Sequence, residues 1–536
     1  MLLPSLAGYR RVWLPRDVMA GLAAGAVVIP QAMAYATIAD LPVAVGLYTC
    51  ILPMLVYALL GGSRAMSVST TSTVATLTAT TLVTAGVVSS APDGLGALTT
   101  LTLLVGAILL LARLLRLGSL VENISGATVL GVQIGVGAIV AVGQVPTMLG
   151  ETLDVSGEGL FAVIAAAIAS VGTASVPTVA LSAGSVAVLL LLRRFAPQVP
   201  GALIVAVGGI LLVGLGHLDA LGVALIDAVP TGMPRLGLPD LSVAGDLVPG
   251  ALAIAVMAFL ESAAVARTIR ERSQPQIDSD RELLAMGAAN VLGAFSAAMP
   301  AAGGFSQSAV NRGAGARTQL AGVVTAVLAI LVALFLGPVL SLLPQATLSA
   351  MVLVAVVGLI DVRELVRWAR LSPVDFWVAL TVALVALAAG LLVAVGVGVA
   401  ATLLLVLREL NTPRLDILDQ RGSALAVHVG RGLYTANARP ISRAVISLAV
   451  RRRPAVSALI LDLTRQDALT VTVLDALEEL EADLAAHDVV LDLAALPPPA
   501  AAVAARVDWY RRLQALGRVH ATVRDGMAAV APEEDV

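Results

Sequence analysis

Apolar segments follow one another along the sequence from residue 18 to residue 409, separated by short polar connections. Because hydrocarbon offers no partner to an exposed backbone N–H or C=O group, such segments fold as membrane helices, and each needs about 20 residues to cross the bilayer. The composition agrees, since 58% of the residues are hydrophobic and only 13% are charged, against about 25% charged residues in soluble domains. The sequence therefore predicts a polytopic membrane protein.

We expect fourteen membrane segments in this part of the chain. Two of them, the third and the tenth, are too short to cross the membrane alone and require the extended residues that precede them. A further apolar run at 159–170 is expected to lie at the membrane interface or to pack sideways. The fourteen segments are near 18–36, 42–60, 70–86, 97–115, 124–147, 176–193, 201–217, 247–266, 282–298, 305–316, 319–337, 345–360, 375–390 and 391–409.

The arginines indicate how these segments are oriented. The chain contains arginine but no lysine. If the N-terminus is cytoplasmic, the arginines of the membrane part fall on the cytoplasmic side, and only Arg235 falls outside. The outer connections carry acidic residues such as Asp40 and Asp219. The positive-inside rule therefore favours fourteen segments with both termini in the cytoplasm.

Glycines interrupt the apolar pattern before the tenth segment. Gly303 and Gly304 free the backbone from helical geometry. We expect Ser306 to cap the short helix that follows. The unpaired N–H groups and the positive dipole end of that helix would point into the membrane, where they attract an anion.

A similar order of features occurs in the first half of the chain. Asp17 and Gly21 open the first segment, as Asp246 and Gly250 open the eighth. The polar run 67–73 follows the first pair at a distance comparable to that between the second pair and the glycine break. Matched helix breaks in two halves are typical of internally repeated transporters, which bind their substrate where the broken helices meet.

One carboxylate lies inside an apolar segment. Glu261 follows Phe259 and Leu260 and precedes further apolar residues. An ionised carboxylate is costly in hydrocarbon, so Glu261 should face a polar cavity or hold a proton, which marks it as a functional candidate. The alternative is a structural acid that pairs with a buried hydroxyl or backbone group.

After Thr412 and Pro413 the charge density becomes ordinary. Alternating and helical apolar spacing predict strands at 424–429, 458–463 and 489–493 and helices at 471–486 and 501–516. This order predicts a small cytoplasmic α/β domain. A phosphate-binding glycine motif is absent from its strand-to-helix junctions, so the sequence does not support nucleotide hydrolysis.

Other signals for chemistry are weak. No nucleophile is placed beside a base by any motif, so we expect no enzyme activity and no cofactor. A net charge of −3 gives no sign of nucleic-acid binding, and Cys50 is expected to be a small buried hydrophobe. Four histidines lack metal-ligand spacing and are expected to lie on the surface: His217, His428, His487 and His520.

Seven motifs together resemble the SulP anion transporters, also called solute carrier family 26, which have a membrane part followed by a STAS domain. The resemblance implies a membrane domain at 1–411 with inverted repeats of seven helices at 15–217 and 246–410. It also implies a cytoplasmic STAS domain at 412–536, a homodimer and a place in a bacterial inner membrane. The motifs are at 20–36, which includes Pro30-Gln31-Ala32-Met33-Ala34-Tyr35, and at 46–48, 55–59, 63–68, 280–283, 305–311 and 314–318.

The resemblance also implies where the anion binds. In the family it lies between the N-terminal ends of the third and tenth helices, and a core domain moves against a gate domain in alternating access of the elevator type. Backbone N–H groups and hydroxyls can bind an anion without a fixed cation, so that release remains possible. The matching residues are Gln31, Tyr35, Ser69, Thr70, Thr71, Phe305, Ser306 and Gln307.

Purely structural roles stay open for several of these residues. Gln31 could serve only to satisfy carbonyl groups that Pro30 leaves free, and Tyr35 could be an ordinary packing residue. The run 67–73 could be a polar packing surface, because serine and threonine also hold membrane helices together.

Departures from the family pattern bear on substrate and coupling. Many animal and plant members have arginine where this chain has Gln307, which weakens the case for tightly held sulfate and favours a singly charged anion. Sodium-coupled bicarbonate members have hydroxyl groups where this chain has Val265 and Phe305, which cannot ligate a hard cation. We therefore expect proton-coupled symport, in which protonation of Glu261 compensates the charge of the anion.

The identity of the anion stays open between bicarbonate, sulfate, chloride, nitrate and small dicarboxylates. Alternatives to proton symport are anion exchange and sodium-coupled bicarbonate uptake, and a nucleobase carrier of the same fold is a weaker one. A membrane-tethered STAS signalling module is a further alternative. In related phosphoregulated domains a serine is modified in a turn that corresponds to 470–473, where this chain has valine. We therefore expect a structural, dimerising or partner-docking domain.

Overall fold

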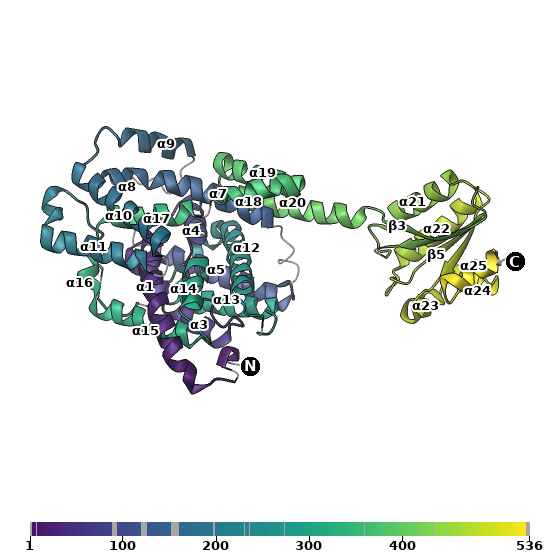
Figure 1. Ribbon diagram of the computed structural model, residues 1–536, viewed down its shortest axis with the longest axis horizontal. Helices are drawn as coiled ribbons and strands as arrows, with labels where there is room; N and C mark the ends of the chain where they lie inside the picture. The colour runs from purple at the N-terminus through teal and green to yellow at the C-terminus, as the bar shows by residue number, and fades with distance from the viewer. Residues whose placement is uncertain are drawn as a thin grey trace. The chain divides into compact units, whose positions relative to one another are not determined.

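The computed structural model describes residues 3–6, 8–87, 94–118, 126–151, 160–196, 199–229, 231–234, 236–272, 274–358, 360–430 and 432–531. The chain divides into two compact units, residues 1–402 and 403–536. The first is built mainly of helices, and the second contains a five-stranded sheet (Figure 1). Arg235, the arginine expected on the outer side, lies outside the described residues.

Every expected membrane segment overlaps a helix or a pair of helices. The first half contains α1 (Leu14–Ile38), α2 (Val43–Thr49), α3 (Leu52–Leu60), α4 (Ser72–Thr84), α5 (Gly94–Leu114), α7 (Gly126–Gly143), α8 (Val145–Leu149), α9 (Leu160–Ala169), α10 (Val176–Phe195) and α11 (Gly201–Gly216). The second half contains α12 (Ala244–Ile269), α13 (Ser279–Ala294), α14 (Phe305–Gly313), α15 (Leu320–Phe335), α16 (Gly337–Leu340), α17 (Gln345–Val357), α18 (Val362–Leu371), α19 (Pro373–Ala389) and α20 (Leu391–Asn411).

Length and composition allow some of these helices to cross a membrane unaided. Among the described residues, eight helical stretches are long and apolar enough to do so. Four further apolar helices are shorter, namely α9, α11, α15 and α19. The segment expected at 42–60 is a pair of helices, because Pro53 in the first turn of α3 has no N–H to continue the helix that precedes it.

Two short extended segments carry the chain into the broken helices. β1 (Val68–Ser69) and β2 (Ala302–Gly303) pair in antiparallel fashion, with Val68 opposite Gly303. α4 follows β1 and has 13 residues, and α14 follows β2 and has 9. At 1.5 Å per residue both are too short to cross a hydrocarbon core of about 30 Å. Both expected helix breaks are therefore present, and they lie side by side.

Asp17 joins the start of α1 to the start of α15. Its Oδ1 atom accepts hydrogen bonds from the backbone N–H of Arg317 at 2.6 Å and of Thr318 at 3.1 Å. Its Oδ2 atom accepts from the Thr318 hydroxyl at 2.6 Å. The helices then run in close contact (Figure 1), since a Cβ atom on Gly21 would lie 2.4 Å from the carbonyl oxygen of Ala321. In the sequence, Asp17 indicated only where the first repeat begins. In the structure, its carboxylate connects α1 to the residues that precede α15.

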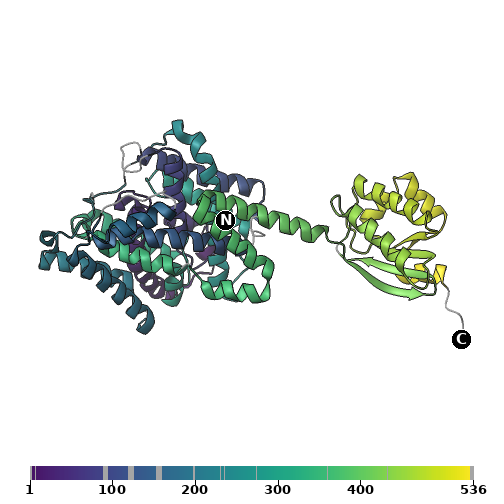
Figure 2. The same cartoon turned by 90° about the horizontal axis from the view of Figure 1, so that it is seen from above.

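The C-terminal unit is an α/β sandwich. Its sheet has the order β3-β4-β5-β6-β7, with β3 antiparallel to β4 and the other neighbours parallel. Helices layer against this sheet (Figure 2), and α21 and α22 pack on one face through a core of leucines and valines, while α25 covers the other face. The elements are β3 (Leu415–Arg421), β4 (Ala424–Val429), α21 (Ala438–Arg451), β5 (Ala458–Asp462), α22 (Val471–Ala485), β6 (Val490–Ala494), α23 (Pro498–Ala504), α24 (Asp508–Ala515), β7 (Val519–His520) and α25 (Val523–Val530).

The expectation that the histidines lie on the surface is wrong for two of them. His428 Nδ1 lies 2.7 Å from Asp462 Oδ2, and His520 Nε2 lies 2.7 Å from Asp492 Oδ2. The two imidazole side chains are only 17% and 9% exposed. Neighbouring strands bring each histidine to an acid that is distant in the sequence. Within the described part of the chain, no group of three metal-ligating side chains could hold a metal ion.

Candidate functional site

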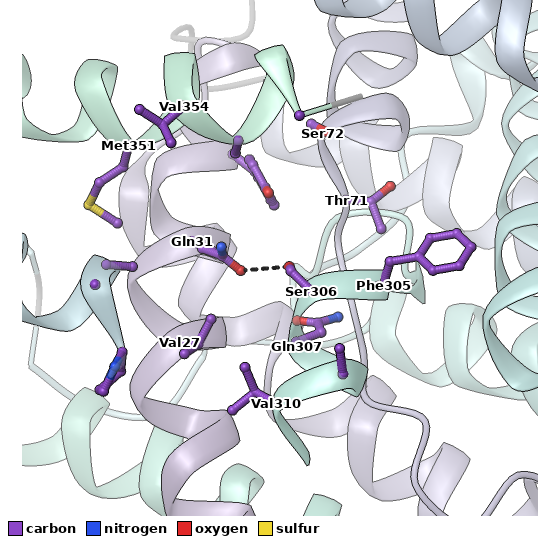
Figure 3. A pocket seen from close by; sticks show the side chains of 18 of the residues that line it. Val27, Gln31, Thr71, Ser72, Phe305, Ser306, Gln307, Val310, Met351 and Val354 are labelled. Atoms are coloured by element: carbon purple, nitrogen blue, oxygen red, sulfur yellow. Dashed lines mark hydrogen bonds between the residues drawn. The ribbon is translucent and has the colours of Figure 1, made fainter. Parts of the chain in front are cut away.

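A cavity of about 620 Å³ lies in the helical unit, in the range of 300–1,000 Å³ that is common for small-ligand sites. Its wall includes α1, the starts of α4 and α14, and parts of α7, α10, α11, α12 and α17. Figure 3 shows this cavity with side chains from both halves of the chain around it. The structure brings most of the expected site residues to its wall: Gln31, Tyr35, Thr70, Thr71, Phe305, Ser306, Gln307 and Glu261.

The start of α4 presents hydroxyl groups to the cavity. Thr71 caps the helix, because its Oγ1 atom accepts a hydrogen bond from the Val74 N–H at 3.3 Å. Thr70 and Thr73 also line the cavity. Both hydroxyls are buried; that of Thr70 has no hydrogen-bond partner among the described residues, whereas the Thr73 side chain interacts with Glu261. Buried hydroxyls in this situation are suited to a polar ligand, because an unsatisfied polar group is costly.

The start of α14 differs from the expected arrangement. Gly304 is the N-cap residue and the helix begins at Phe305, so the prediction that Ser306 caps this helix is wrong. The Gly304 carbonyl already accepts from the Ser308 N–H at 3.1 Å, which places Ser306 inside the first turn. The N–H groups of Phe305, Ser306 and Gln307 precede that bond and have no acceptor within the helix. They can therefore bind an anion.

The Ser306 hydroxyl reaches across the cavity to α1. It donates a hydrogen bond to Gln31 Oε1 at 3.3 Å (Figure 3). Tyr35 lies one turn further along α1 and is buried. The Phe305 ring is directed away from the Gln31–Ser306 pair (Figure 3) and is 45% exposed. Gln31 therefore contacts the second half of the chain, and its role is not limited to satisfying carbonyl groups that Pro30 leaves free.

Ser69 and Gln307 hold the two broken helices together. The Gln307 amide Nε2 donates to the Ser67 carbonyl at 3.1 Å, and Gln307 Oε1 accepts from the Ser69 hydroxyl at 3.1 Å. Ser308 Oγ accepts from the Ser67 N–H at 2.9 Å. Ser69 is fully buried and is the one expected site residue that does not line the cavity. Both side chains are therefore placed to support the site by joining α14 to β1.

Glu261 projects from α12 into the cavity wall and is 4% exposed. Its Oε2 atom accepts a hydrogen bond from the Thr71 hydroxyl at 2.8 Å. Thr71 therefore contacts both the acid and the first turn of α4. The next residue, Ser262, accepts from the Gly303 N–H at 2.8 Å, so α12 also holds β2 in place.

The wall opposite the broken helices contains residues that the sequence did not single out. Gln133 of α7, Arg193 of α10 and Met351 and Val354 of α17 all line the cavity. They are scattered over three helices with no shared motif, so no sequence signal groups them. In the sequence, Arg193 is one of many arginines at the ends of expected helices, and nothing distinguishes it from the others.

Comparison of the sequence with known proteins gives consistent matches. A family model described as the sulfate permease family matches residues 14–382. A probable sulfate transporter of Mycobacterium tuberculosis (strain ATCC 25618 / H37Rv) is 32% identical over 513 residues, which cover 91% of this chain and 90% of that protein. The chloroplastic sulfate transporter 4.1 of Arabidopsis thaliana is 30% identical over 421 residues, which cover 75% of this chain and 60% of that protein.

Solved structures show the same fold. The murine solute carrier 26 family member A9 anion transporter in the inward-facing state superposes with a TM-score of 0.86, covering 98% of this chain and 94% of that chain. The transmembrane domain of a cyanobacterial bicarbonate transporter superposes with a TM-score of 0.62, covering 73% of this chain and 98% of that domain. Both are 20% identical to this chain, so they establish the architecture alone.

Proposed function

This chain belongs to the sulfate permease family, and on that basis we propose that it moves a small anion across the membrane together with a proton. Members of the family are anion transporters and not enzymes, so the chain is a multi-pass anion transporter. The observation that carries the proposal is the meeting of two helix N-termini beside a buried acid in one cavity.

The anion would bind between α4 and α14. The first-turn N–H groups of both helices and the Thr70 hydroxyl offer donors, and each helix end adds about half a positive charge. Gln31, Tyr35, Phe305 and Thr71 would shape the remaining wall. Gln307 supplies a neutral amide that is already engaged by β1, which favours a singly charged anion over tightly held sulfate.

The proton would bind to Glu261. When this acid is ionised it repels an anion in the same cavity: two like charges roughly 8 Å apart at an effective dielectric constant of about 20 repel by about 2 kcal/mol, or about thirtyfold in affinity. Protonation removes this repulsion. Because Thr71 hydrogen-bonds Glu261 and caps α4, the charge of the acid is also linked directly to the helix end that binds the anion.

We extend the proposal to the organisation of the whole chain. The membrane domain would comprise 1–411, with seven-helix inverted repeats at 15–217 and 246–410 and fourteen segments in all. Residues 412–536 would form a cytoplasmic STAS domain that docks a cytoplasmic partner or contributes to a homodimer in a bacterial inner membrane. The strand and helix order of the C-terminal unit and the match to a murine family member over 98% of the chain support this.

An uptake screen tests the proposed function. The full chain would be reconstituted in liposomes and supplied with bicarbonate, sulfate, chloride, nitrate or a four-carbon dicarboxylate in sodium-free buffer. We expect accumulation of at least one anion, with a clear preference for a singly charged form, only under an inward proton gradient. Accumulation that requires sodium, or strict one-for-one exchange that ignores the proton gradient, would contradict proton symport.

A further inference from the structure

One basic side chain lines the cavity. Arg193 lies in the last turn of α10, on the same helix face as Leu189, which lines the cavity as well. Positions three and four residues apart on a helix share a face. Apart from Glu261, Arg193 is the lining residue that carries a full charge at neutral pH within the described part of the chain.

In the described part of the chain, Arg193 forms no ion pair with an acid. Within the described residues, no carboxylate lies at ion-pair distance from its guanidinium. One guanidinium nitrogen lies 3.5 Å from the place that a Cβ atom on Gly358 would occupy, directly after the C-terminal end of α17. The negative end of a helix dipole attracts a cation without cancelling its charge. Arg193 is an exposed residue whose guanidinium lies beside this helix end, and its charge acts on the cavity that it lines.

We propose that Arg193 sets the charge preference of the anion path, an inference that rests on the proposed function. At the start of α14 the Gln307 side chain contributes a neutral amide and no charge. Arg193 supplies a full positive charge to the cavity from a different helix, α10. A charge at that place raises the local concentration of anions in the cavity without binding them in the first turn of either broken helix.

This role has a quantitative signature. The energy of an anion in the field of Arg193 is proportional to the charge of the anion. If removal of the guanidinium charge raises the half-saturating concentration of a monovalent anion about fourfold, it must raise that of a divalent anion by the square of this factor, about sixteenfold. Loss of a packing contact would instead affect both anions by the same factor.

The test compares three substitutions in the reconstituted full chain. Half-saturating concentrations and maximal rates of nitrate and sulfate uptake would be measured at low and at high ionic strength for Arg193→Gln, Arg193→Lys and Arg194→Gln. Arg194 is the matched control, because it follows Arg193 on the same helix, stacks on the Phe195 ring at 5.7 Å and does not line the cavity.

We expect Arg193→Gln to raise the half-saturating concentration about fourfold for nitrate and about sixteenfold for sulfate at low ionic strength. Both effects should shrink in high salt, while maximal rates stay nearly unchanged. Arg193→Lys should remain within about twofold of the parent, since it keeps the charge, and Arg194→Gln should match the parent. For a variant that does not fold, the parent protein alone remains informative, because its half-saturation by sulfate should depend more steeply on salt than that by nitrate.

Several outcomes would overturn the proposal. Equal factors for the two anions, a lower maximal rate at unchanged half-saturation, or an equal effect of Arg194→Gln would each assign Arg193 a structural role. A parent protein that takes up at least one anion but shows these results disproves the inference and leaves the proposed function standing. A parent protein that neither takes up nor is thermally stabilised in a saturable way by either anion disproves both.

Discussion

Glu261 and Thr71 share one hydrogen bond of 2.8 Å, and this contact is the smallest unit at which proton and anion binding can be coupled. The acid comes from the middle of α12 and the hydroxyl from the cap of α4. Each residue alone has an ordinary structural explanation. Their contact inside a cavity lined by helix N-termini is what favours a functional role.

Glu261→Gln should abolish proton-driven accumulation. The glutamine amide has almost the same shape as the glutamate carboxyl group, but it cannot bind and release a proton at the pH of transport. Folding should be preserved, and the variant should still exchange labelled for unlabelled anion across liposomes without a proton gradient. Accumulation would be measured at a series of external pH values. Transport with an unaltered pH dependence in this variant would refute the assignment of the proton to Glu261.

Thr71→Val should remove both the cap of α4 and the partner of Glu261. Loss of a helix cap costs about 1 kcal/mol, and an unpaired buried acceptor costs about 1–3 kcal/mol. We expect a lower midpoint of thermal unfolding together with a weakened pH dependence of uptake, and Thr71→Ser should restore both. Thr80→Val is the matched control, since among the described residues the Thr80 hydroxyl bonds only to the Thr76 carbonyl of its own helix, and Thr80 does not line the cavity. An equal effect of Thr80→Val would contradict a special role of Thr71.

At the scale of elements, the site depends on the pairing of β1 with β2. This pairing places the first turns of α4 and α14 side by side, although they belong to different halves of the chain. Ser69 and Gln307 reinforce it with a side-chain hydrogen bond of 3.1 Å. Gln307 lines the cavity while Ser69 does not, so this hydrogen bond connects the cavity wall to β1.

Gly303→Ala should disturb this element directly. A Cβ atom at that position would lie 2.5 Å from the Met66 sulfur and 3.1 Å from the Ser262 backbone, so β2 would have to move away from α12. Overpacking of this kind costs about 1–3 kcal/mol. We expect a lower unfolding midpoint and strongly reduced uptake. Gly313→Ala at the end of α14, where no atom lies within 4 Å, should have little effect on either quantity; equal damage from both substitutions would contradict the importance of the β1–β2 junction.

At the scale of the whole molecule, the cavity and the C-terminal unit are separate. Every lining residue belongs to the unit formed by residues 1–402, and the sheet belongs to residues 403–536. The Mycobacterium tuberculosis relative matches 91% of this chain, so the similarity extends over both units.

Deletion of residues 412–536 should leave proton-driven uptake per folded molecule nearly intact, because no group at the site is removed. The amount of folded protein and its dimerisation are expected to fall. Uptake in vesicles would be normalised to the amount of folded transporter, and the oligomeric state would be measured by light scattering in detergent. Loss of uptake by a folded, truncated protein would instead assign the C-terminal unit a direct part in transport.

Long apolar segments could be predicted because burial in hydrocarbon imposes a simple rule on length and polarity. Each expected segment overlaps helix in the structure, whereas the amphipathic helix α18 was not expected. The helices and strands of the C-terminal unit were predicted less completely. β3, α21, β7 and α25 were missed, since β3 has an exposed edge pattern, α21 carries several arginines and β7 has only two residues. Such elements are stabilised by their neighbours more than by their own periodicity.

The sequence by itself determined the membrane class, the positions of the helices, the two breaks and the presence of one acid among apolar residues, because each of these depends on local composition. Only the tertiary structure decided which side chains meet. Thr71 and Glu261 are 190 residues apart, Ser69 and Gln307 are 238 apart, and Arg193 reaches the same cavity from α10. Distances between packed helices arise from the fit of whole surfaces, and no local pattern in the chain encodes them.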